Sequence, residues 1–250
     1  MRTVSHRERP DLIVAFEEME SGAFPDFMLH DDIWNEHWPR ILETFPDLQL
    51  YVLDGEAVAG VINTVPVAWD GSATDLPGSE HDVLIRSLAD HSAERSITAL
   101  VGIQIAIADS HAGTGLTEFA IGEARRLAAD RAHGHVIFPV RPTLKHRYPT
   151  VAFDRYIDWT RDDGLPFDPW IRAQVRNGAS RLGVCREPMV FTGTVAEWEE
   201  WSGLVFKDSG EYVIDGALEL LSVDLEGDKG RLEEINVWYV YNLGPSGASS

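Results

Sequence analysis

The segment that most restricts the fold is a buried strand that runs into a glycine-containing loop and then into an amphipathic helix. Residues 99–108, ALVGIQIAIA, are apolar almost throughout, which is typical of a strand covered on both faces. Residues 109–115 form a short loop with two glycines, and apolar residues then recur at helical spacing over 116–132. A further apolar run, residues 135–140, completes a strand–helix–strand unit, for which we expect parallel neighbouring strands.

The remaining elements flank this unit on both sides. Before it, apolar spacing predicts a helix over 32–45 capped by Asp31 or Asp32, a hairpin that turns at Asp54-Gly55, and a short helix. The ranges of the hairpin strands and the short helix are 48–53, 57–67 and 82–91. After the unit, the pattern predicts a helix over 168–182 and then a series of strands, at 187–195, 211–214, 218–225 and 232–241. This order predicts an α/β or α+β fold with a mixed sheet in one domain, 1–243, followed by a flexible Gly/Ser-rich tail, 244–250.

Charge and composition restrict the partners. Acidic residues outnumber basic ones 41 to 21, a formal net charge of −20. This field repels phosphate backbones and attracts cations, so we expect no nucleic-acid partner. No apolar run is long enough to span a membrane, and the first residues do not resemble a secretory signal. One cysteine, Cys185, suits a reducing compartment, and we expect a cytoplasmic protein with no membrane partner.

The glycine loop is the candidate site for an anionic ligand. A helix N-terminus carries unpaired N–H groups and a positive dipole end, so it can hold phosphate without lysine. An ordinary strand-to-helix turn explains the two glycines equally well. Two familiar phosphate loops fit worse, because Leu116-Thr117 stands where a P-loop needs Lys-Ser/Thr, and Glu118 stands where a dinucleotide fingerprint needs glycine or alanine. Arg141, at the end of the following strand, would suit a 2′-phosphate.

The hairpin, the strand ALVGIQIAIA, the loop DSHAGTGL, the amphipathic helix and the strand HVIFPV together resemble the core of the GNAT superfamily of acyl-CoA-dependent N-acyltransferases. The resemblance implies a mixed, splayed sheet flanked by helices, here with an extended β-rich C-terminal part. It also implies that backbone groups of Ile105, Ala106 and Ile107 bind the pantetheine arm. The family's pyrophosphate motif, Arg/Gln-x-x-Gly-x-Gly/Ala, is matched to six residues, namely Ala112, Gly113, Thr114, Gly115, Leu116 and Thr117. Ala112 and Thr117 depart from that motif.

The catalytic groups implied by the resemblance are incomplete. Many family members carry a tyrosine four residues before a Gly-Phe pair, and the matching residue here is Ala179. Gln104 is the strongly polar side chain of the core strand nearest the loop. Deprotonation is therefore assigned to water or to the irregular segment 141–167, which contains Tyr148 and Tyr156. The histidines lack zinc-ligand spacing, so no metal is expected.

These observations predict an N-acyltransferase, most simply an N-acetyltransferase, that moves an acyl group from acetyl-CoA or another acyl-CoA to an amine of a small molecule. The carboxylates between Asp158 and Asp168 favour a basic amine. Two alternatives stay open. One is a GNAT-like protein that binds acyl-CoA without turnover, and the other is a nucleotide-dependent oxidoreductase. A homodimer is also left open.

Overall fold

The computed structural model describes residues 1–244, apart from the side chains of residues 20–23. Except for Gly244, the tail predicted at 244–250 lies outside the described residues. Within this part of the chain, no helix is long and apolar enough to cross a bilayer.

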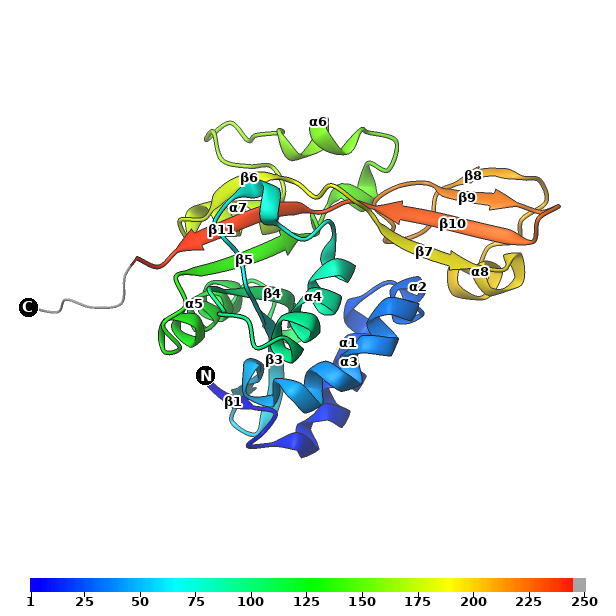
Figure 1. Cartoon of the computed structure of the whole chain (residues 1–250). Coiled ribbons are helices and arrows are strands. Elements are labelled where there is room, and N and C mark those ends of the chain that lie inside the picture. The colour runs from blue at the N-terminus through cyan, green and yellow to red at the C-terminus, as the bar shows by residue number, and fades with distance from the viewer. Residues whose placement is uncertain (245–250) are drawn as a thin grey trace, which may run out of the picture.

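A seven-stranded mixed sheet forms the centre of the molecule (Figure 1). Its strands, in order across the sheet, are β1 (Arg2–Ser5), β2 (Gln49–Asp54), β3 (Ala57–Val67), β4 (Ala99–Ile107), β5 (His135–Val140), β11 (Val237–Asn242) and β6 (Ser180–Val184). All neighbours are antiparallel except β4 and β5, which are parallel as expected for a strand–helix–strand crossover. The predicted hairpin is confirmed, with Gly55 at a positive φ of 63° in the turn between β2 and β3.

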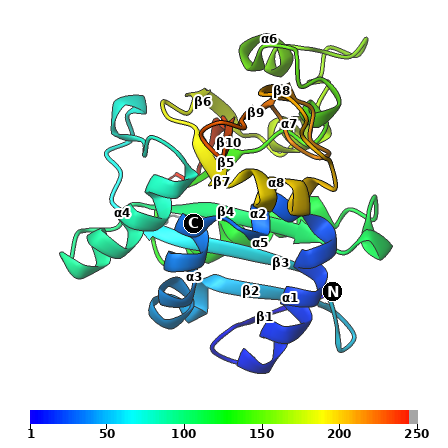
Figure 2. The same ribbon diagram turned by 90° about the vertical axis from the view of Figure 1, so that its right-hand side faces the viewer.

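Helices cover both faces of this sheet. Their bounds are α1 (Ile13–Ala23), α2 (Asp26–Leu29), α3 (Asp32–Thr44), α4 (Glu80–Ser92), α5 (Leu116–Ala129), α6 (Phe153–Ile157), α7 (Pro169–Arg176) and α8 (Val195–Ser202). On β1, Val4 packs in the α1 cluster, whereas the neighbouring Thr3 donates a hydrogen bond to Glu123 of α5 at 2.7 Å. Successive side chains of a strand point to opposite faces, so α1 and α5 lie on opposite sides of the sheet. Figure 2 views the sheet from the side of α1 and α3.

The part of the chain between β6 and β11 in sequence forms a second, four-stranded sheet (Figure 1). Its antiparallel order is β7 (Met189–Gly193), β10 (Lys229–Glu234), β9 (Leu221–Asp224) and β8 (Gly210–Tyr212). The fully buried Trp198 of α8 lies over Gly230, where a Cβ would stand 2.2 Å from its indole ring. This sheet therefore has its own apolar cluster, which includes Phe191 and Leu232. The prediction that residues 1–243 form one domain stays a prediction.

Two sequence-based elements are wrong in their extent. The helix predicted over 168–182 ends at Arg176, because Gly178 adopts a positive φ of 88° and the amides of Gly178 and Ala179 bond back to the last turn. Ala179 therefore lies in the connection to β6 rather than on a helix. The strand predicted over 232–241 is two strands in different sheets, β10 and β11. Buried Asn236 lies between them, and its carbonyl accepts a hydrogen bond from the amide of Cys185.

Candidate active site

An opening in the main sheet lies between β4 and β5. The two strands are paired at Ala99↔His135, Leu100↔Val136 and Val101↔Ile137, and no further pair is formed within the described residues. β4 continues to Ile107, while β5 continues to Val140 against β11 on its other edge. The Phe138 ring fills the space beside Gly102, where an added Cβ would lie 2.0 Å from the ring. The expected splay of these parallel strands is present, and it begins at Gly102.

The open edge of β4 presents backbone groups to this space. The amide of Ala108 donates to Ala59 of β3 at 3.0 Å. Backbone groups of an antiparallel strand alternate between its two edges, so those of Ala106 also face β3, while those of Ile105 and Ile107 face the opening. Two of the three residues predicted to bind a pantetheine arm therefore direct their backbone groups toward the space where the arm would lie.

The glycine loop leads from β4 into α5. Gly113 and Gly115 adopt positive φ values of 74° and 85°, which favour glycine, and Gly115 is the N-cap of α5 without a side-chain capping bond. Among the residues that the structure describes, the amides of Gly115, Leu116 and Thr117 have no hydrogen-bond acceptor. The loop is exposed, and a Cβ at either glycine would meet open space. These unpaired amides at the start of a helix of 14 residues form a geometry that binds phosphate.

A group of buried polar side chains lies at the end of β5, across the sheet from α5. Glu80, in the first turn of α4, accepts a hydrogen bond at 3.1 Å from the side-chain amide of Asn236. Asn236 is 1% exposed and directly precedes Val237, which pairs with Val140 at the end of β5. Burial, followed by the charge of Asp31, raises the pKa of Glu80 to about 8. The residue as a whole is partly exposed, while its carboxyl group is buried.

Asp31 and His81 hold the first turn of α4 in place. One carboxylate oxygen of Asp31 caps α3 by accepting from the amides of Ile33 and Trp34, both at 3.0 Å. Its other oxygen lies 2.6 Å from Nε2 of His81, the residue after Glu80. This buried pair ties α4 to α3 and therefore fixes the direction in which Glu80 points.

Arg141 closes the other side of the group. Its guanidinium forms a bidentate ion pair with the fully buried Glu234 at 2.6 and 3.0 Å, and it also donates to the Gly216 carbonyl. Arg141 is thus committed within the protein, and the 2′-phosphate contact considered from the sequence is not available to it. Burial also raises the pKa of the nearby Cys185 thiol, with the Glu80 charge as the next cause. A thiol of that kind is a poor nucleophile.

The predicted catalytic side chains contact other residues within the protein. Gln104 lies on β4 directly opposite Asn63 of β3, which donates to it at 2.5 Å, and both are buried. Tyr156 is 1% exposed and donates its hydroxyl to Asp168, the N-cap of α7, at 2.8 Å. Burial and the Asp168 charge raise the pKa of Tyr156. Tyr148 packs in the same aromatic cluster. Their part in proton transfer stays a prediction.

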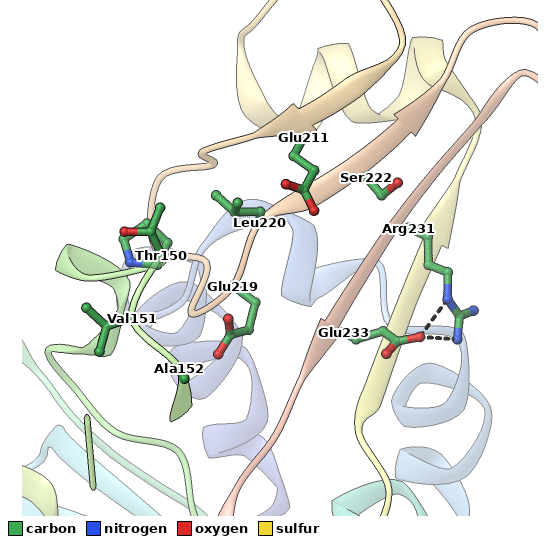
Figure 3. A pocket seen from close by; sticks show the side chains of 10 residues that line it. Thr150, Val151, Ala152, Glu211, Glu219, Leu220, Ser222, Arg231 and Glu233 are labelled. Atoms are coloured by element: carbon green, nitrogen blue, oxygen red, sulfur yellow. Dashed lines mark hydrogen bonds and ion pairs between the residues drawn. The ribbon is translucent and has the colours of Figure 1, made fainter. Parts of the chain in front are cut away.

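A surface cavity of about 530 Å³ lies elsewhere, between the segment before α6 and the second sheet (Figure 3). Glu211, Glu219 and Glu233 line it together with Arg231, which is paired to Glu233. Figure 1 shows α6 and the second sheet on the side of the molecule away from α5. We therefore place the candidate active site at the β4–β5 opening rather than in this cavity. In the described residues, no group of three His, Cys, Asp or Glu side chains could hold a metal ion.

Sequence reasoning missed Glu80, Asp31 and Asn236 as site residues. The sequence predicts Asp31 only as a possible cap of the following helix, and it is that cap. The short helix is predicted to begin at Asp82, whereas it begins at Glu80, capped by Ser79. Nothing in the local pattern indicates that these positions converge with residue 236.

Comparisons with known proteins agree with this geometry. No family model matches the chain. An arginine N-acetyltransferase of Aspergillus versicolor is 24% identical over 269 residues, which cover 94% of this chain and 91% of that protein. The loading GNATL domain of CurA from Lyngbya majuscula superimposes with a TM-score of 0.58 at 11% identity, covering 97% of each chain. The GphF GNAT-like decarboxylase, in complex with isobutyryl-CoA, superimposes with a TM-score of 0.57 at 14% identity, covering 97% of this chain and all of that one.

The solved structures establish the fold, and the curated relative extends over nearly the whole chain. The splayed β4–β5 pair and the glycine loop before α5 are the features on which the sequence resemblance depended. The chain therefore has the fold of the GNAT-like structures, and along nearly its whole length it is similar to an arginine N-acetyltransferase.

Proposed function

We propose that this protein transfers an acyl group, most simply acetyl, from acyl-CoA to a nitrogen of a small cationic molecule of the arginine class. One observation carries the choice of acceptor, namely the carboxylates of Asp31 and Glu80 and the amide of Asn236 gathered beside the β4–β5 opening. The Asp31 charge favours a positively charged ligand there, and a cation bound beside Glu80 favours the ionised form of that carboxyl. The arginine N-acetyltransferase that matches along the chain supports the same substrate class.

In this proposal the two substrates bind on opposite faces of the sheet. On the α5 side, the amides of the segment from Ala112 to Thr117 would hold the pyrophosphate. The thioester would then lie in the opening, where backbone groups of Ile105 and Ile107 face it. An N–H group aimed at the thioester carbonyl would stabilise the negative charge that develops on its oxygen during attack.

The acceptor would approach from the side of α1, α3 and α4. Ala106 packs in the α1 cluster, and Gln104 lies two residues before it on the same strand, opposite Asn63. Side chains on this face can therefore orient an acceptor toward the opening. The overall negative charge of the chain would raise the local concentration of a cation.

Thiol release tests this function. The protein is incubated with acetyl-CoA and one acceptor at a time, using L-arginine, agmatine, a diamine and a neutral amino acid, and free CoA is measured with a thiol reagent. We expect the fastest release with the guanidinium-bearing acceptors and an acceptor mass increased by one acetyl group. Tight acetyl-CoA binding without thiol release from any of the four would favour the non-catalytic acyl-CoA-binding alternative.

Three further proposals accompany this function. Tyr148 or Tyr156 supplies the proton to the departing thiolate, directly or through water, which the phenylalanine variants would test. The protein acts in the cytoplasm, which its single buried cysteine supports. It works as a monomer or a homodimer, which light scattering distinguishes.

A further inference from the structure

The first turn of α4 brings one carboxylate to the reacting end of the sheet, and the proposed transfer needs a group that accepts a proton there. In the parallel register of β4 and β5, three residues beyond the last pair, Val101↔Ile137, are Gln104 on β4 and Val140 on β5. Val140 pairs with Val237, whose neighbour Asn236 bonds to Glu80. Glu80 is therefore held at the level of Gln104, where the two strands have separated.

In the described part of the chain, the side-chain nitrogen of Asn236 donates a hydrogen bond, whereas its side-chain oxygen has no hydrogen-bond partner. Its Nδ2 donates to Oε2 of Glu80 and contacts the Met189 sulfur at 3.5 Å. Its Oδ1 is buried and has no hydrogen-bond partner among the described residues. If the amide were rotated by half a turn, Oδ1 would face Glu80 and Nδ2 would be the unused end. In either orientation a buried polar atom beside Glu80 lacks a partner, which indicates a polar ligand at this place.

The surroundings of Glu80 adjust it for proton transfer at neutral pH. Its pKa of about 8 is far closer to the pKa of an alkyl ammonium group than the usual carboxyl value is, so the proton moves less steeply uphill. The charged and titratable groups near this carboxyl come from several elements, namely Asp31, His81, Arg141, Cys185 and Glu234. Arg141 alone among them favours the ionised form, and its pairing with Glu234 limits that effect.

We infer that Glu80 is the general base of the proposed acyl transfer and that Asn236 positions both Glu80 and the acceptor nitrogen. The inference rests on the proposed function. Glu80 takes one proton from the acceptor ammonium, and the freed lone pair forms the C–N bond to the thioester carbonyl carbon. The tetrahedral intermediate then breaks its C–S bond, and the thiolate leaves with the electron pair. The thiolate takes up a proton from the tyrosine proposed above, the surplus proton of the new amide nitrogen restores that tyrosine through water, and Glu80 returns its own proton to solvent.

This arrangement places the base on the helix between β3 and β4, whereas the core strand β4 carries no carboxylate or histidine. Oε1 of Glu80, which has no hydrogen-bond partner in the described part of the chain, is the oxygen available to the acceptor. The hydrogen bond between His81 and Asp31 fixes the residue next to Glu80, so we assign these two residues a positioning role.

The test compares kcat/KM for the best acceptor over pH 6 to 10 in the parent protein and in Glu80→Gln. The parent should show an inflection near pH 8. We expect Glu80→Gln to lose about 10²- to 10⁴-fold in kcat and to lack that inflection, while its thermal stabilisation by acetyl-CoA is unchanged. Glu94→Gln, an exposed change just after the other end of α4, is the matched control and should behave like the parent.

Two further variants keep the inference testable if Glu80→Gln does not fold. Glu80→Asp should retain the inflection at a reduced rate, and Asn236→Ala should move it to higher pH, because the amide hydrogen bond favours the ionised carboxylate. A parent enzyme that releases no thiol with any amine overturns the proposed function. If the parent enzyme is active and the Glu80 variants have the same rate and pH profile as the parent, the assignment of Glu80 as the base is wrong, while the proposed function stands.

Discussion

The buried Glu80 carboxyl makes the stability of the folded protein depend on pH in a direction that one substitution can isolate. The folded protein raises the pKa of this group from 4.5 to about 8, chiefly by burial. Between these two values the unfolded chain has released the proton and the folded chain still holds it. The native state then binds more protons than the unfolded state, so the free energy of unfolding falls as pH rises.

The size of the effect follows from the same two values. The difference between 4.5 and about 8 corresponds to on the order of 4–5 kcal/mol, at about 1.4 kcal/mol for each tenfold change in proton affinity. Glutamine has nearly the shape of a protonated glutamate and does not ionise. We therefore expect Glu80→Gln to match the parent near pH 5 and to be more stable by several kcal/mol at pH 9.

Urea unfolding measures this difference, with fluorescence of the eight tryptophans as the probe at pH 5, 7 and 9. The quantity compared is the variant minus the parent, because carboxylates elsewhere titrate equally in both proteins. The exposed Glu94→Gln variant should give a difference within about 0.5 kcal/mol of zero at all three pH values. A Glu80→Gln difference that stays constant from pH 5 to pH 9 would refute a buried, neutral Glu80 and weaken its assignment as the base.

Three other substitutions test the opening and its surroundings. Gly115→Val should abolish the melting-temperature shift that acetyl-CoA causes, because φ is 85° there, while the exposed helical Gly122→Ala should retain the shift and gain about 0.5–1 kcal/mol in stability. Gly102→Ala places a methyl group against the Phe138 ring, so it should lower the free energy of unfolding in urea by about 1–3 kcal/mol and weaken acetyl-CoA binding. Unchanged affinity for acetyl-CoA would show that the opening tolerates the displacement of this ring. Tyr156→Phe removes one of the four donors to the Asp168 carboxylate, which keeps the amides of Leu144, Trp170 and Ile171, and it should cost about 1–3 kcal/mol. An added loss of kcat would indicate that the hydroxyl also serves as the acid.

Sequence patterns located the elements that are specified by their own residues. The strand over 99–107, the loop and the helix from Leu116 lie close to where the apolar spacing and the glycines predict them. The Thr-x-x-Glu spacing of Thr194 and Glu197 is typical of a capping box, and both reciprocal bonds are formed at the start of α8. Each of these features depends on contacts within a few residues, which is why the sequence alone indicates them.

The predictions failed where contacts from distant segments decide the structure. The sequence pattern predicts one strand over residues 232–241, but β10 alternates between buried and exposed residues whereas β11 is buried at five of its six positions, because the two strands belong to different sheets. Helix α7 ends at Arg176, six residues before the predicted end, because Gly178 adopts a positive φ, and the chain then forms β6, which pairs with β11. Apolar residues satisfy both a helix and a buried strand, so periodicity alone could not separate the two.

The glycine loop shows how the structure sharpens a motif. Matched from Ala112 to Thr117, the pyrophosphate motif departs at its first and last positions. Matched two residues earlier, from Ser110 to Gly115, it places both of its glycines on the residues with positive φ and departs only at Ser110. The second register also ends at the N-cap of α5, where the unpaired amides begin. The start of the helix, which glycine spacing does not fix, is therefore what distinguishes the two registers.

The Glu80 group could not be found from the sequence, because its members come from four segments that only the fold brings together. Asp31 and Glu80 begin two helices, Arg141 follows the end of β5, and Asn236 lies between two sheets. Burying an acid beside another acid costs stability, and here a buried amide end without a partner lies in the same place. Apolar side chains in place of Glu80 and Asn236 would avoid both costs, so stability alone does not explain these two residues. The unfavourable terms coincide at the end of the β4–β5 opening, so the simplest reason for keeping them is a polar, cationic substrate that satisfies the amide and exchanges a proton with the acid.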